Sequence, residues 1–210
     1  MEAIIENAAL ALFMLCFGLS LARAFDMRTR PWVILSFGFA CNMFAQAYWV
    51  GYIMVFGETP AYFYISDIGW AADFLFILMV LVECNIKRAP TPPTPAAWIP
   101  VVISAVLCVY YIAIGNNAIA CLVDNGLMAS IGYFAVRGVV HASGGKEESR
   151  RFRDNRAFAA MCLAFVAIEL SLWTASCFYA EVPVLYDIFN YALFASHAGL
   201  LACAWRSEET

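Results

Sequence analysis

The chain has 210 residues, of which 64% are hydrophobic and 13% charged, and its formal net charge is −4. An ordinary soluble domain is roughly 45–50% apolar and about 25% charged, so this composition excludes a soluble globular enzyme and a disordered chain. The acidic balance leaves no basic surface for nucleic acid, and we expect no nucleic-acid partner. The composition predicts an integral membrane protein whose first partner is the lipid bilayer.

Eight cysteines are present, but they lie singly, with no Cys-x-x-Cys pair and no Cys/His cluster of metal-binding spacing. Such a distribution is not typical of a metal site. Nearly all of them fall inside apolar runs, where cysteine behaves as a small apolar residue. We therefore expect no metal in this chain and interpret the cysteines as packing residues.

Long apolar stretches follow one another along the whole chain. A bilayer core of about 30 Å needs roughly 20 apolar residues per helix, and seven stretches qualify: residues 3–25, 32–56, 61–86, 97–115, 117–138, 157–180 and 184–205. Backbone in hydrocarbon must satisfy its own hydrogen bonds, and β-barrel alternation is absent, so each span is predicted to be a helix. We therefore predict an all-α, polytopic membrane protein in which residues 1–210 form one domain of seven transmembrane helices.

The segments between the spans differ in their predicted structure. Gly115-Asn116-Asn117 predicts a very tight turn, and residues 142–156 predict a polar, charged loop. Several spans also carry small residues spaced for close helix packing, namely Gly38 with Asn42, Gly126 with Ser130, and Ser196 with Gly199.

Basic residues indicate the orientation. All 12 lysines and arginines lie near the C-terminal ends of spans one, three, five and seven or in the segments that follow these spans. The N-terminus and the other connections carry none. Lys and Arg are enriched on the cytoplasmic side of membrane proteins. We therefore predict a multi-pass plasma-membrane protein with its N-terminus outside and its C-terminus inside.

Spans two and three resemble spans six and seven. Trp49 is followed by Glu58-x-Pro60 and Asp67, and Trp173 is followed by Glu181-x-Pro183 and Asn190; aligned on the prolines, Asp67 meets Asn190. One interpretation is a repeat of three helices, a linker helix and three more helices. The other is chance similarity between apolar segments that share an interfacial Trp and a loop Pro.

Polar residues inside the predicted spans need a reason, because a charge at the centre of a membrane helix costs about 2.5–3.5 kcal/mol even on the mildest scale. Asp73, Glu169 and His197 fall near mid-depth, where Asn42 and Gln46 join them from one face of span two. Asp67, Asp124 and Asn190 lie nearer the outside, and Trp70 and Trp173 are aromatic neighbours of these groups. We predict that these ten residues line a pocket between helices for a small ligand or a proton.

Two interpretations of the polar residues stay open. In the first, Asp73 and His197 share one proton and respond to pH, since His is the side chain that titrates near neutrality. In the second, the amides and acids only hold helices together through hydrogen bonds worth about 0.6 kcal/mol each on average.

Short motifs in spans two, three and seven resemble microbial rhodopsins. The similarity is carried by residues 51–57, by Pro60-x-Tyr62, by Ala72-Asp73-Phe74-Leu75-Phe76, and by Ser196-His197-Ala198-Gly199 with Arg206 nine residues after the histidine. The resemblance implies that Asp73 takes the counterion position and that His197 takes the place of the retinal-binding lysine. Since His cannot form the Schiff base that lysine forms, covalent retinal and light-driven pumping are not expected, and we expect no cofactor.

The third span, with Ser66-Asp67-x-x-Trp70, also resembles the membrane sensory regions of bacterial signalling proteins. No nucleophile elbow, P-loop or HExxH motif is present, and we expect no enzymatic activity. The favoured function is a sensor or receptor-like protein, with a cytoplasmic protein or a second copy of the chain as a further partner. The alternative is a small-solute or proton-coupled transporter built from three, one and three helices.

Overall fold

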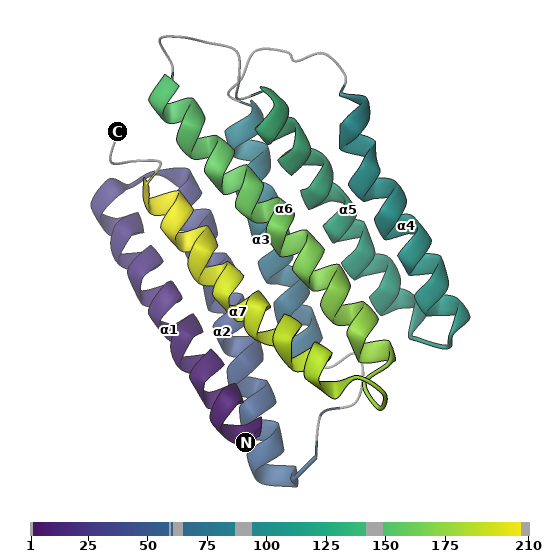
Figure 1. The fold of residues 1–210 in the computed structure, drawn as a ribbon. Helices are drawn as coiled ribbons and strands as arrows, with labels where there is room; N and C mark the ends of the chain where they lie inside the picture. The colour runs from purple at the N-terminus through teal and green to yellow at the C-terminus, as the bar shows by residue number, and fades with distance from the viewer. Residues whose placement is uncertain (1, 59, 61–64, 87–93, 142–148, 207–210) are drawn as a thin grey trace. The chain divides into compact units, whose positions relative to one another are not determined.

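The computed structural model describes residues 2–58, 60, 65–86, 94–141 and 149–206. These residues are helical apart from short turns, and seven of their helices are long and apolar enough to cross a membrane. The helices are α1 (Glu2–Met27), α2 (Arg30–Phe56), α3 (Ile65–Ile86), α4 (Trp98–Ala113), α5 (Ala118–His141), α6 (Ser149–Cys177) and α7 (Pro183–Arg206), and a 3₁₀ turn (Pro95–Ala97) precedes α4 (Figure 1). The predicted all-α, seven-span architecture is confirmed, and the chain is a multi-pass membrane protein.

The predicted spans agree closely with the helices, with one clear difference. Residues 149–156 were expected in a polar loop, but they form the first two turns of α6. That prediction was wrong because hydropathy marks where a helix enters hydrocarbon, whereas charged residues also form helix well beyond that point. The beginning of the third predicted span (residues 61–64), residues 87–93 and residues 142–148 lie outside the described residues.

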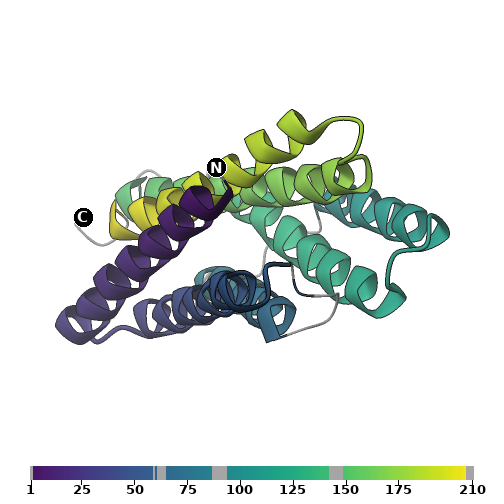
Figure 2. The same cartoon turned by 90° about the horizontal axis from the view of Figure 1, so that it is seen from below.

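The chain divides into two compact units, residues 1–80 and 81–210, which we describe separately. The first unit contains α1, α2 and α3 as far as Val80. The views in Figures 1 and 2 show α1 and α2 side by side, and Arg28, with a left-handed φ of 51°, turns the chain between them. Phe13, Leu35 and Phe39 are almost completely buried in this unit.

Two glycines bring α2 and α3 into close contact in the first unit. A Cβ added at Gly69 would lie 2.7 Å from Ala45 Cβ and 3.0 Å from the Cys41 carbonyl oxygen. A Cβ added at Gly38 would lie 2.9 Å from Asp73 Oδ1. Both positions therefore depend on the missing side chain, as expected where helices associate in lipid through small residues, and the packing role predicted for Gly38 is confirmed.

The second unit contains α4 to α7, each packed against the next helix in the chain. The turn between α4 and α5 is as tight as predicted. Gly115 has a φ of 98°, and the Asn117 side-chain oxygen accepts hydrogen bonds from the backbone N–H groups of Ile119 and Ala120 at 3.0 and 3.2 Å. These bonds satisfy donors at the start of α5 that the helix itself leaves without partners.

Other glycines control packing in the second unit. A Cβ at Gly132 would overlap the Pro100 ring, a Cβ at Gly138 would lie 2.7 Å from Ala159 Cβ, and one at Gly199 would lie 2.9 Å from Met161 Sδ. The packing role predicted for Gly199 is confirmed. The role predicted for Gly126 is wrong, because no heavy atom in the described chain lies within 4 Å of a Cβ built there. Small residues also occur on helix faces that meet lipid, so spacing alone does not separate the two cases.

A buried tyrosine joins α4 to α6. Thr174 Oγ1 lies 2.7 Å from the Leu170 carbonyl oxygen, which can only accept, so the threonine proton is directed there. Tyr111 OH, 2.7 Å from Thr174 Oγ1 and 3.2 Å from the same carbonyl, is then the donor in this contact. The Tyr111 side chain is fully buried, and the Trp173 ring lies beside it, tilted by 32°, with ring centroids 6.1 Å apart.

Replacing Tyr111 by phenylalanine is expected to lower the free energy of unfolding by about 0.6–1.5 kcal/mol, since the ring is kept and only the hydroxyl donor is lost. The adjacent Tyr110 is 39% exposed and serves as the control. Reversible unfolding of the purified protein in mixed micelles measures both variants. An equal loss in Tyr110→Phe would show that the change does not come from the bond to Thr174.

Candidate functional site

Two pairs of acid and amide side chains lie within the first unit. Asn42 Nδ2 on α2 donates a hydrogen bond of 2.8 Å to Asp73 Oδ2 on α3. One helical turn along α2, Gln46 Nε2 donates to Glu6 Oε2 on α1 and lies 3.5 Å from the Glu6 backbone carbonyl oxygen. Because Asn42 and Gln46 share a face of α2, the central helix links the two carboxyl groups. We call Glu6, Gln46, Asn42 and Asp73 the acid–amide network.

Burial makes this network chemically unusual. Asp73 is fully buried, and Asn42 and Gln46 are each only 2% exposed. Glu6 is half-buried and lies in the second turn of α1. The network therefore extends from a partly exposed acid near the N-terminus of α1 to the buried Asp73. A charged carboxylate away from water costs several kcal/mol unless it is neutralised or strongly hydrogen-bonded.

The packing around Asp73 is tight as well as polar. Gly38, one turn before Asn42 on α2, leaves the space that Asp73 Oδ1 occupies. The Phe76 ring, on the turn of α3 after Asp73, stacks on Phe37 with centroids 6.0 Å apart. A change in the charge or hydrogen bonding of Asp73 therefore directly alters the packing between α2 and α3.

Other predicted site residues of the first unit surround this region less closely. Trp70 packs on Trp49 with ring centroids 5.5 Å apart, which joins α3 to α2 one turn before Asp73. Asp67 lies half-buried in the first turn of α3. A carboxylate at a helix N-terminus interacts favourably with the helix dipole, so Asp67 has a structural role at this place in addition to the binding role predicted for it.

In the second unit, His197 is 1% exposed on α7. Its Nδ1 lies 2.9 Å from the Leu193 carbonyl oxygen, which only accepts, so Nδ1 holds a proton and donates it. The Phe165 ring of α6 meets the imidazole edge-to-face, with centroids 5.3 Å apart. Glu169, 5% exposed, follows Phe165 by four residues and therefore lies on the same face of α6.

The other predicted residues of this unit do not gather around His197 in the contacts described. Trp173 packs against Tyr111, Cys108 and Cys121, where it contributes to an apolar cluster between α4, α5 and α6. Asp124 on α5 and Asn190 on α7 are half-buried. The structure thus brings Asn42, Gln46 and Asp73 together in one unit and His197 close to the Glu169 face of α6 in the other. Asp73 and His197 belong to different units, so the predicted Asp73–His197 pair stays a prediction.

Sequence reasoning missed several polar residues. Glu6 lies inside the first predicted span, and an acid within a span was the available signal. Ser104 on α4 and Asn125 on α5 are 0% and 5% exposed. Asn125 Nδ2 donates to the Cys121 carbonyl oxygen at 2.9 Å, while the Ser104 hydroxyl and Asn125 Oδ1 have no hydrogen-bond partner among the described residues.

Within the described parts of the chain, no three His, Cys, Asp or Glu side chains are placed to hold a metal ion. Comparison of this chain with family models, curated proteins and solved structures finds no match. Its likeness to the rhodopsins is therefore one of layout, seven helices of membrane-spanning length and hydropathy.

Proposed function

We propose that this protein is a membrane sensor that takes up and releases a proton at the acid–amide network of α1, α2 and α3. The observation that carries the proposal is the buried hydrogen bond from Asn42 to Asp73 at a close contact between two helices. A buried acid that is bonded to an amide has two distinct states, charged and neutral, with different hydrogen-bonding needs.

The charge distribution in the first unit favours a proton as the neutralising species. Residues 2–80 contain no lysine or histidine, and their arginines are Arg23, Arg28 and Arg30. Arg30 precedes Asn42 by 12 residues of α2, which corresponds to roughly 18 Å at 1.5 Å per residue. The arginine of α2 is therefore far along the helix axis from the Asn42–Asp73 bond.

Tight packing links the proton to a conformational signal. The Asp73 carboxylate fills the space beside Gly38, so loss of its charge weakens the bond from Asn42 at a close contact between α2 and α3. A small shift of packed helices is a common form of switching in proteins. The position of Asp73, which the resemblance to rhodopsins implies is a counterion position, supports the same function, with the plasma membrane as its location.

The proposal is tested with the full chain in liposomes. Infrared difference spectra between acidic and alkaline buffer are expected to contain a carboxyl band that Asp73→Asn removes. Asp187→Asn is the control, because Asp187 is an exposed acid on α7 and its substitution should leave that band in place. A pH-sensitive dye inside the liposomes is expected to report no protein-dependent proton flux.

Two results would overturn the proposal. Proton flux that Asp73→Asn abolishes would identify a proton-coupled transporter instead. If the carboxyl band is unchanged in Asp73→Asn and this variant only unfolds more easily, the network serves helix association and has no sensing role.

A further inference from the structure

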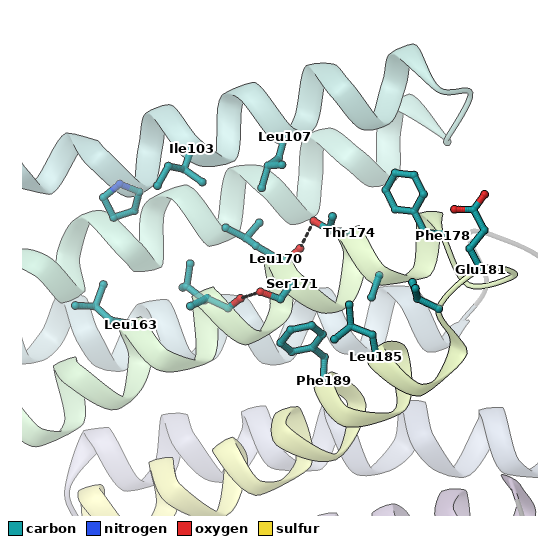
Figure 3. Close-up of a pocket in the computed structure, with 15 residues that line it drawn as sticks. Ile103, Leu107, Leu163, Leu170, Ser171, Thr174, Phe178, Glu181, Leu185 and Phe189 are labelled. Atoms are coloured by element: carbon teal, nitrogen blue, oxygen red, sulfur yellow. Dashed lines mark hydrogen bonds between the residues drawn. The ribbon is translucent and has the colours of Figure 1, made fainter.

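An open groove runs along α6 in the second unit. Its volume is about 690 Å³, and its walls include Ile103 and Leu107 of α4, Leu170 of α6, and Leu185 and Phe189 of α7 (Figure 3). Ligand sites commonly have volumes of about 300–1,000 Å³, so the groove has the size of a binding site. None of the ten binding residues predicted from the sequence lines it.

The few polar groups in the groove are distributed unevenly. The Ser171 and Thr174 hydroxyls donate to the Ala167 and Leu170 carbonyl oxygens of their own helix, each at 2.7 Å. Their protons are therefore not available for hydrogen bonds to a ligand. Glu181 stands at the end of the groove, in the turn between α6 and α7, and is exposed (Figure 3). The groove is therefore an apolar channel with a single acidic side chain at its mouth.

The length of the groove suits a lipid chain. Along α6 its lining runs from Leu163 to Ala175, or roughly 18 Å at 1.5 Å per residue, whereas one leaflet of hydrocarbon is about 15 Å thick. An apolar groove that opens to lipid is filled by hydrocarbon, since an empty space there loses dispersion contacts. Hydrocarbon by itself gives little preference for one lipid over another, because lipid tails resemble apolar side chains. The headgroup at the mouth then decides which lipid binds.

The charges of the second unit favour a cationic headgroup at that mouth. In the helices of this unit the arginines are Arg137 near the end of α5, Arg206 at the end of α7, and four in the first turns of α6, namely Arg150, Arg151, Arg153 and Arg156. Since α5, α6 and α7 each pack against the next helix and the α6–α7 turn is short, these arginines lie at the opposite end from Glu181. None of these arginines is therefore available at the mouth to bind a free anionic headgroup, while Glu181 attracts an ammonium group.

We propose that the groove between α4, α6 and α7 binds a bilayer phospholipid with an ammonium headgroup, of the phosphatidylethanolamine type. One acyl chain lies along α6, and the ammonium group pairs with Glu181. This lipid site is separate from the proposed proton site, so either proposal stands or fails without the other.

The test is native mass spectrometry of the full chain in detergent with equal amounts of phosphatidylethanolamine and phosphatidylglycerol that have the same acyl chains. The wild-type protein is expected to retain about 1.5 to 5 times more phosphatidylethanolamine, the range of an exposed charge pair. Glu181→Gln should equalise the two lipids. Ala167→Trp, at an exposed position in the groove, should lower retention of both by at least threefold.

Ala160→Trp is the matched control, because Ala160 is also exposed on α6 but does not line the groove; it should behave as the wild type does. Equal retention of the two lipids by the wild-type protein, or unchanged retention in Ala167→Trp, would overturn the proposal. A wild-type dimer that Ala167→Trp converts to a monomer would also overturn it, by showing that a second copy of the chain occupies the groove.

Discussion

Replacing Asn42 by leucine is expected to lower the free energy of unfolding by about 2–4 kcal/mol. The amide that donates to Asp73 at 2.8 Å is removed, while the carboxyl group, fully buried, keeps its place against α2. Removing one partner of a buried polar pair costs more than the bond itself contributes, because the remaining group has already lost its water.

The double variant Asn42→Leu/Asp73→Leu is expected to recover most of that loss, since two apolar side chains of similar volume leave no polar group behind. Equilibrium unfolding in mixed micelles of both single variants and the double variant completes a double-mutant cycle. Asn190→Leu, at a half-buried position on α7, is the control and should change stability little. Additive effects of the two single substitutions would contradict a direct coupling of Asn42 with Asp73.

The second large effect is expected at Gly132. A Cβ at this position would overlap Pro100 Cβ and lie 3.2 Å from Cγ of the same ring, and a proline ring cannot move aside by changing rotamer. Gly132→Leu should therefore separate α4 from α5 and lower the free energy of unfolding by about 3 kcal/mol or more. Gly132→Ala should show a smaller loss, of about 1–3 kcal/mol.

Gly126 provides a matched comparison, since it is an exposed glycine on the same helix with no described heavy atom within 4 Å of an added Cβ. Gly126→Leu should be neutral or slightly stabilising, because leucine favours helix over glycine by somewhat less than 1 kcal/mol. The four proteins are compared by thermal unfolding in detergent. Equal behaviour of Gly126→Leu and Gly132→Leu would show that the contact with Pro100 does not limit α4–α5 packing.

The membrane class, the seven helices and the tight turn at Gly115 followed directly from the order of residues. Each of these properties depends on a local rule: the thickness of the hydrocarbon core sets the length of an apolar span, and a left-handed backbone favours glycine. The same local rules explain where the prediction stopped short at α6, since the helix continues through Ser149–Arg156 into a region that hydropathy describes as polar.

Which polar residues meet, and which glycines are packed, was decided by tertiary structure. Helices that are apolar on all sides carry no periodic pattern that marks a buried face, so Gly126 and Gly132 look equivalent in the sequence and differ only by the presence of Pro100. In the same way the sequence identifies Asn42 and Asp73 individually as polar groups at mid-depth. The hydrogen bond between them, and the one between Gln46 and Glu6, depend on the rotation of three helices about their axes. That rotation results from side-chain packing between segments far apart in the chain, which local physical rules do not specify.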